Sequence, residues 1–419
     1  MKLITSLFCA GLVAALTGCD DDEPLADATN DVNDVDIMDE QEQEEEATEP
    51  PSEPTCIAPE DAFPITSGLT PGATTGPFYA SVSPFEYADR ARSHVHSADF
   101  FGSMSAPEEN SVSSRTMTGT YEFPYNVATR DRDELFVYGG DPVSGITPYV
   151  AKISIGTGEQ VWRTEIPYGE GQFSWPGLAA IHGNGDVYAV HSSSLIRIDP
   201  LSGEIRGSVE LPAPEGRSTA NMAYNGFNVS STGLLVLKSL GRPEGCELQG
   251  FDALSECVTE ETPAPPSLFS LLDPETLEVE DSLEFDSNVF GRLAIATFDE
   301  REFIYIVAET ELTRIEIKDG TLVLDESWSY ADFTKDGQSS PTAAVVMDDW
   351  VVFQMNGSPA QTPMTVHAVS QADSSVFATA DPFGPGGAGI SFVLSSLTAD
   401  PATLRVYSQD TGRGQIAGL

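Results

Sequence analysis

Short apolar runs separated by polar turns repeat along most of this chain. The stretch from Leu178 to Pro212 is the clearest example, with the apolar runs LAAI, VYAV, LIRI and VELP separated by Asn184-Gly185, by a serine triplet and by Asp199-Pro200. Runs of this length between turn residues are typical of strands in a meander. Asn-Gly favours a type I′ hairpin, and Pro200 cannot donate to a β-ladder. The stretch therefore predicts one four-stranded antiparallel sheet.

Similar units recur, and their second and third strands can be followed by register. Each second strand carries an apolar pair: Val137-Tyr138, Val187-Tyr188, Leu235-Val236, Ile304-Tyr305, Val352-Phe353 and Val406-Tyr407. The third strands are expected at 149–155, 195–199, 268–273, 312–317, 366–370 and 415–419. Units of about 40 to 50 residues with four short strands are typical of propeller blades. The pattern predicts an all-β fold, a β-propeller with six four-stranded blades.

Fourth strands follow only five of the six third strands. The missing one is expected near the front, where RTMTGTYEFP (115–124) matches the ending of GSVELP. An N-terminal strand that completes the C-terminal blade closes the ring and removes two free sheet edges. Seven blades stay open as an alternative if residues 62–112 form a full sheet. Aligning the first strands brings small residues to one expected axial position: Val127, Ala179, Ala223, Ala294, Ala343 and Gly389.

The chain begins with features of a secretory signal. Lys2 precedes a short apolar run and then Leu16-Thr17-Gly18-Cys19, which resembles a bacterial lipoprotein signal whose cysteine is lipidated. We expect residues 1–18 to be the signal peptide, 19–61 a lipidated Cys19 and an acidic disordered spacer, 62–112 an N-terminal arm, and 113–419 the propeller. The resemblance implies a bacterial cell-envelope protein anchored by lipid, on the periplasmic face or the cell surface.

The charge is strongly acidic. The chain has 66 Asp and Glu against 20 Lys and Arg, a net charge of −46, and the spacer from Asp20 to Asp61 holds 18 acidic and no basic residues. Such a spacer cannot bury enough apolar area to order itself. The remaining chain is also acidic, which disfavours nucleic acid and anionic headgroups as partners. We expect a monomer whose partner is an envelope protein or a small anionic ligand.

The cysteines predict one disulfide. Cys246 and Cys257 lie in one long insertion, 239–266, and a local disulfide is expected in an oxidising compartment, while the fate of Cys56 stays open.

Catalytic motifs are absent from the sequence: we find no G-x-S-x-G elbow, H-E-x-x-H, P-loop or C-x-x-C. A ligand site is expected at the mouth built by the loops between blades and between second and third strands. The candidates are Asn221, Arg292, Arg217, Arg242, Trp175 and His191. Three arginines on one rim suit a carboxylate, sulfate or phosphate, whereas the alternative is that they pair within the protein.

The segment AKISIGTGEQVWRTEI (151–166), with Trp162 on its outer strand, resembles the repeat of PQQ-like, quinoprotein-type propellers. The family's dehydrogenases use adjacent cysteines beside the quinone, and this chain has none, so we expect neither PQQ nor another cofactor, with an axial calcium left open. The favoured function is a lipid-anchored binding or scaffold module. The alternative is a propeller enzyme, either a metal-dependent hydrolase or lactonase or a sulfotransferase or redox type.

Overall fold

Antiparallel sheets formed by consecutive strands dominate the computed structural model. It describes residues 74–79, 81, 83–86, 88–93, 121–130, 134–335, 338–357, 363–384, 397–400, 403–410 and 414–419. The chain divides into two compact units, Met1–Pro54 and Thr55–Leu419, and every described residue belongs to the second. The signal peptide, Cys19, the whole spacer, Cys56 and Gly389 lie outside the described residues.

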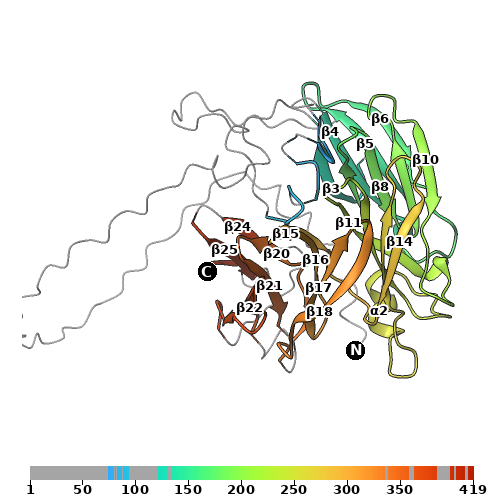
Figure 1. Cartoon of the computed structure of the whole chain (residues 1–419). Helices are drawn as coiled ribbons and strands as arrows, with labels where there is room; N and C mark the ends of the chain where they lie inside the picture. Colours follow the sequence, from blue (N-terminus) through green and yellow to red (C-terminus); the bar gives the residue numbers. More distant parts are fainter. Residues whose placement is uncertain are drawn as a thin grey trace, which may run out of the picture. The chain divides into compact units, whose positions relative to one another are not determined.

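The first three blades each contain four strands (Figure 1). Blade 1 is formed by β3, β4, β5 and β6 (Pro124–Thr129, Glu134–Asp141, Ile146–Ser154, Gln160–Glu165). Blade 2 is formed by β7, β8, β9 and β10 (Leu178–Ile181, Val187–His191, Ser194–Ile198, Ile205–Glu210). Blade 3 is formed by β11, β12, β13 and β14 (Met222–Val229, Leu235–Gly241, Ser267–Leu272, Val279–Phe285).

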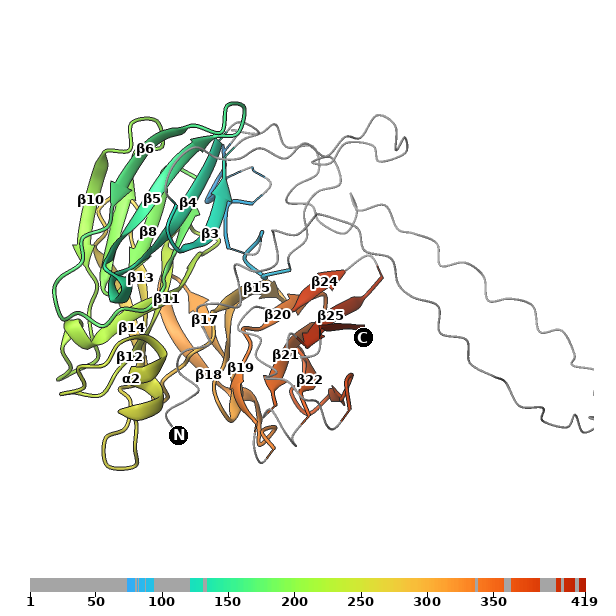
Figure 2. The same cartoon turned by 180° about the vertical axis from the view of Figure 1, so that it is seen from behind.

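The remaining blades follow in the same order along the chain (Figure 2). Blade 4 is formed by β15, β16, β17 and β18 (Ala294–Phe298, Arg301–Val307, Glu311–Lys318, Thr321–Ala331). Blade 5 is formed by β19, β20, β21, β22 and β23 (Ser339–Pro341, Val345–Met347, Trp350–Asn356, Thr365–Ser370, Phe377–Ala380), with both β19 and β20 paired to β21. Blade 6 is formed by β24, β25 and β26 (Thr398–Asp400, Arg405–Asp410, Gln415–Gly418).

These six sheets confirm the predicted β-propeller with six blades. Every predicted apolar pair lies on the second strand of its blade, and every predicted third strand is found within three residues of its expected bounds. The described part of blade 6 has three strands. Residues 115–120 lie outside the described residues, so closure of the ring by the 115–124 segment stays a prediction, and its last residue, Pro124, begins β3.

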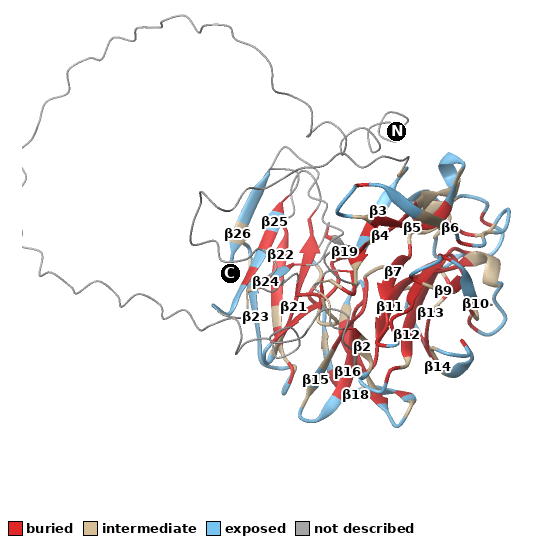
Figure 3. Cartoon of the chain, turned by 90° about the horizontal axis from the view of Figure 1, so that it is seen from above, coloured by how far each residue is buried: buried red, intermediate tan, exposed pale blue. Residues whose placement is uncertain are grey.

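Five hydrophobic clusters join the six blades in chain order. Each cluster combines side chains from two consecutive blades, for example Phe136 of blade 1 with Val187 of blade 2, and Val345 of blade 5 with Val406 of blade 6. The other three clusters link blades 2 and 3, 3 and 4, and 4 and 5. Figure 3 shows the buried residues along β7, β11 and β12. Burial between the sheets therefore supplies the apolar stabilisation, as the alternating patterns predict.

Two local predictions are wrong. The expected axial positions are not equivalent: the residues paired with the first member of the apolar pair are Val127, Ile181, Val229, Ile295, Val345 and Ala399. Ala179 lies two residues earlier, because first strands differ in length and contain bulges. The Asn184-Gly185 turn is not type I′, since only Gly185 has a positive φ, 88°, and its N–H donates to His182 O at 2.8 Å.

A short segment, Ser83–Ser93, lies within the predicted N-terminal arm and contacts the first strands of all six blades. From here on, the arm means Ser83–Ser93. Backbone N–H groups of five first strands donate to it, from Thr129 to Ser83 O, Ile181 to Pro84 O, Ile295 to Arg90 O, Val346 to Ala91 O and Ala399 to Ser93 O, at 2.8 to 3.1 Å. In blade 3 the Asn228 side-chain amide donates to Arg90 O at 3.2 Å. Backbone donors away from water need such partners, so the arm supplies an acceptor to one backbone donor of the first strand in five blades and to a side-chain amide in blade 3.

The long insertion of blade 3 contains the short helix α2 (Gly250–Glu256). Cys246 and Cys257 are joined by a disulfide at the start and end of this part of the insertion. Ala253 and Leu254 of α2 pack with Phe173 and Leu240, so the insertion is fixed to the mouth side of blades 2 and 3. Among the described residues, no helix is long and apolar enough to cross a membrane.

Candidate functional site

The loop between β6 and β7, Ile166–Gly177, brings together most of the residues predicted at the mouth. His191 contacts Ser174 of this loop, Arg242 contacts Gly171, and Arg292 contacts Pro176 and Gly177. Gly177 is required at this position, because a Cβ there would lie 1.9 Å from Val190 O. These predicted residues therefore lie around one loop, and their polar groups contact other parts of the same chain.

His191 at the end of β8 is buried, with 1% of its surface exposed. Gly177 N donates to Tyr138 Oη at 2.9 Å, and the same hydroxyl lies 2.7 Å from His191 Nδ1. The other ring nitrogen, Nε2, lies 3.4 Å from Ser174 Oγ. Burial lowers the pKa of His191 to about 3. The ring is thus a fixed neutral hydrogen-bonding group with little basicity at neutral pH.

Arg242 fastens the blade 3 insertion to the mouth. Its guanidinium donates to Leu248 O and to Gly171 O, both at 2.7 Å, and to Asn221 Oδ1 at 2.9 Å. It also lies over the Phe173 ring, 5.6 Å from its centroid. Burial lowers the pKa of Arg242. Since the donors are directed to carbonyl and amide oxygens, this arginine acts in the structure as a brace between loops.

Arg292, just before β15, is also buried and satisfied by the chain. Its guanidinium donates to the Asn225 carbonyl oxygen, lies 3.4 and 3.3 Å from Pro176 O and Gly177 O, and pairs with Glu86 of the arm at 3.2 Å. Its cation lies 5.2 Å from the centroid of the Tyr125 ring. The arm therefore supplies the carboxylate for this arginine.

The three arginines do not form the expected rim. Arg217 is exposed on the loop between β10 and β11, whereas Arg242 and Arg292 are buried with 5% and 6% exposure. Trp175 is half-buried and lies against Phe173, with ring centroids 6.3 Å apart. The sequence alternative, in which the arginines pair within the protein, describes Arg242 and Arg292.

The axial region beside Arg292 carries mainly positive charge. Lys238 is fully buried and donates to Val289 O, and burial lowers its pKa, with Arg292 and Arg92 adding repulsion. The carboxylate of Glu86 pairs with Arg92 and Arg292. Calcium prefers several free carboxylate and carbonyl oxygens. These residues do not fit an axial calcium, and the described chain contains no group of three or more His, Cys, Asp or Glu side chains suited to a metal.

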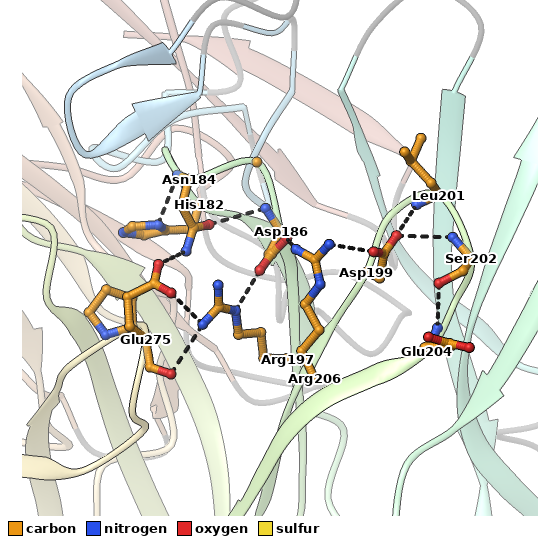
Figure 4. Close-up of polar contacts among 12 residues, drawn as sticks. His182, Asn184, Asp186, Arg197, Asp199, Leu201, Ser202, Glu204, Arg206 and Glu275 are labelled. Carbon is orange, nitrogen blue, oxygen red and sulfur yellow. Dashed lines mark hydrogen bonds and ion pairs between the residues drawn. The ribbon is translucent and has the colours of Figure 1, made fainter.

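A second polar network joins the turn between β7 and β8 of blade 2 to the turn between β13 and β14 of blade 3 (Figure 4). Asp186 is buried and pairs with both Arg197 and Arg206. Arg197 continues to Glu275 at 2.6 Å, and Asn184 donates to the same carboxylate at 2.8 Å. His182 Nε2 lies 2.9 Å from Gly233 O. Arg206 also pairs with Asp199, so two arginines join three carboxylates and the network ties turns of the two blades together.

A cavity of about 530 Å³ opens between the outer strands of blades 4 and 5. It is lined by Tyr330, Phe333, Lys335, His367 and Phe377, together with Ser329, Ala331, Asp332, Ser374, Ser375 and Thr379, and we call it the groove. The sequence analysis missed it. The signal that could have found it is the outer strand of blade 5, FATA, which is uncharged, next to the aromatic segment SWSYADF of blade 4.

Comparison with known proteins gives structural similarity only. No family model matches the chain, and no curated protein matches it by sequence. Among solved structures, BamB from Moraxella catarrhalis is similar at 12% identity over 70% of each chain, with a TM-score of 0.39.

Two further proteins are similar to a comparable extent. Quinohemoprotein alcohol dehydrogenase from Comamonas testosteroni has 10% identity and a TM-score of 0.49, and the match covers 83% of this chain and 60% of the dehydrogenase. Kuenenia stuttgartiensis hydrazine synthase has 11% identity and a TM-score of 0.46 over 73% and 80% of the two chains. At this level of similarity, no activity or ligand is transferred to this protein.

Proposed function

We propose that this protein is a lipid-anchored module of the bacterial cell envelope, and that its propeller binds a partner and catalyses no reaction. The observation that carries the proposal is that the polar side chains predicted to form a ligand site at the mouth are already bonded within the chain. Arg242 donates to Leu248 O and Gly171 O, Arg292 pairs with Glu86, and His191 is held by Tyr138 with a pKa of about 3. Groups already engaged in this way hold the loops in place and are poor acids, bases or anion ligands.

The partner surface then lies on the outside of the blades. The arm bonds to the first strands, and its Glu86 pairs with Arg292. The net charge of the chain, −46, disfavours nucleic acid. The partner we propose is a protein of the envelope.

The anchor is tested with the full chain carrying Cys19→Ser. We expect the unchanged chain in the membrane fraction and the variant in the soluble fraction, because one lipidated cysteine is the proposed attachment. Equal membrane association of the two chains would exclude lipid anchoring at Cys19.

Metal analysis of the purified full-length protein distinguishes the proposed binding function from the enzyme alternative. The proposal expects no stoichiometric calcium and no change in unfolding temperature after dialysis against a chelator. One calcium per chain, together with lactone hydrolysis that the chelator abolishes, would establish the enzyme alternative instead.

A further inference from the structure

The outer strand of blade 5 differs from the outer strands of blades 1 to 4, whereas β26, the edge strand of the described part of blade 6, is likewise uncharged. Exposed sheet edges are usually protected by charged side chains, which oppose pairing with another chain. Outer strands β6, β10, β14 and β18 all contain such charges: Arg163 and Glu165, Arg206 and Glu210, Glu280, Asp281 and Glu284, and Asp325 and Glu326. Strand β23 contains none, and neither does Val376 before it.

This unprotected edge is apolar and exposed. Phe377 is 53% exposed and Val376 50% exposed. The run Val376–Ala380 contains no charged residue. It offers backbone pairing without the electrostatic barrier present at the outer edges of blades 1 to 4.

The groove lies on the face of β23 that points to blade 4. Phe377 and Thr379 both line the groove, and alternate residues of a strand share one face. Alternate side chains of a strand added to β23 would therefore point into the same groove. Tyr330 packs against both Phe377 and Phe333, with its ring centroid 4.8 Å from that of Phe377 and 5.6 Å from that of Phe333. The three rings form one aromatic wall of the groove.

The floor of the groove is held in place by His367. Its Nε2 lies 2.8 Å from Thr365 Oγ1, and its Nδ1 lies 3.1 Å from Tyr330 Oη and 3.2 Å from Thr379 Oγ1. The ring stacks on Phe353 with centroids 5.0 Å apart. These contacts with His367 hold the side chains of the aromatic wall in place before a ligand binds, which reduces the entropy cost of binding.

The rim of the groove carries one cation, Lys335, which is exposed and forms no ion pair with any described residue. Asp332 lines the same groove. A ligand carboxylate would gain energy beside Lys335, whereas a second carboxylate near Asp332 would be repelled. The charge pattern complements a ligand with one carboxylate next to an apolar group.

We propose that β23 and the groove dock an extended peptide of the partner protein, which adds a strand to β23, inserts an aromatic side chain against Tyr330 and Phe377, and places one carboxylate beside Lys335. Strand addition supplies backbone hydrogen bonds, and the groove supplies selectivity. This inference rests on the proposed binding function and names the surface that performs it.

The probe is a fluorescent seven-residue peptide with alternating valine and threonine around a central phenylalanine, followed by one glutamate. Its binding to the full-length protein is measured by fluorescence polarisation. We expect binding to weaken at least about tenfold when the phenylalanine is replaced by alanine, and equally in the protein variant Phe377→Lys. The matched control is Val279→Lys, at the first position of the outer strand β14 of blade 3, which is 43% exposed and far from the groove in sequence.

A charge exchange makes the test independent of folding. Lys335→Glu should weaken binding of the glutamate peptide and restore binding of a peptide with lysine at that position. The inference is overturned if the peptide does not bind, if Val279→Lys weakens binding as much as Phe377→Lys, or if the charge exchange restores nothing. A partner crosslinked in cells through a photoreactive residue at Arg217 but not at Phe377 would also overturn it, while leaving the binding function standing.

Discussion

At the scale of single residues, the mouth is a set of buried polar groups that serve the fold. His191 illustrates this, because its two ring nitrogens face Tyr138 and Ser174 and its pKa is about 3. An unfolded histidine has a pKa near 6.5. The unfolded chain therefore binds a proton more readily than the folded chain between these two values, and stability falls as the pH drops through that range.

This difference predicts a pH-dependent effect of His191→Gln. Between pH 7 and pH 4 the unchanged protein should lose about 3 kcal/mol more stability than the variant, since the variant has no imidazole to protonate. Urea unfolding at several pH values measures the difference. Parallel curves for the two proteins would show that His191 titrates normally in the folded state. His367, whose pKa burial lowers to about 4, should give a smaller effect of the same sign.

Gly177 supplies a second test at this scale. A methyl group there would meet Val190 O at 1.9 Å, and this backbone atom cannot move away cheaply. We expect Gly177→Ala to lower the free energy of unfolding by about 2 to 4 kcal/mol. Gly156→Ala is the matched control, because its nearest neighbour is Ser154 Oγ at 3.8 Å, and it should cost under about 1 kcal/mol. Equal effects of the two substitutions would contradict the close approach at the mouth.

At the scale of elements, the arm and the strands depend on each other through charge. Glu86 lies between Arg92 and Arg292, and all three side chains are at least nine-tenths buried. Removing one partner from a buried ion pair leaves an uncompensated charge, which costs far more than an exposed pair gains.

Glu86→Gln is therefore expected to destabilise the protein by about 3 to 5 kcal/mol and to expose the arm to protease. Glu284→Gln on the outer strand β14, where the carboxylate is exposed, is the control and should have little effect. Thermal unfolding and limited proteolysis measure the two outcomes. An arm that stays protected in Glu86→Gln would show that charge does not hold it.

The strands were predictable from sequence, because apolar pairs such as Val187-Tyr188 record burial on both faces of a second strand. The Cys246–Cys257 disulfide joins cysteines only 11 residues apart. The arm's bonds could not be predicted, since they are made by backbone atoms of Ser83, Pro84 and Arg90, which leave no side-chain pattern. The burial of Arg292 was missed for a related reason: its acceptors are distant carbonyls and Glu86, which lies more than 200 residues away.

At the scale of the propeller, the account depends on one arrangement. Six blades follow each other in the chain, five apolar clusters join them, and one short arm bonds to the first strand of each. Because the arm and the loop Ile166–Gly177 already engage the inward polar groups, we place the binding surface on the outside of the blades. The groove beside β23 is the surface that we propose for this role.

The most direct measurement of this claim is hydrogen exchange of the full-length protein, followed at the amides of Thr129, Ile181, Ile295, Val346 and Ala399. The account predicts that all five exchange slowly and that all five become fast together when residues 74–93 are deleted, while the amide of Val352 in the second strand of blade 5 changes far less. Slow exchange that persists at the five amides after the deletion would contradict the account, because the first strands would then be held without the arm.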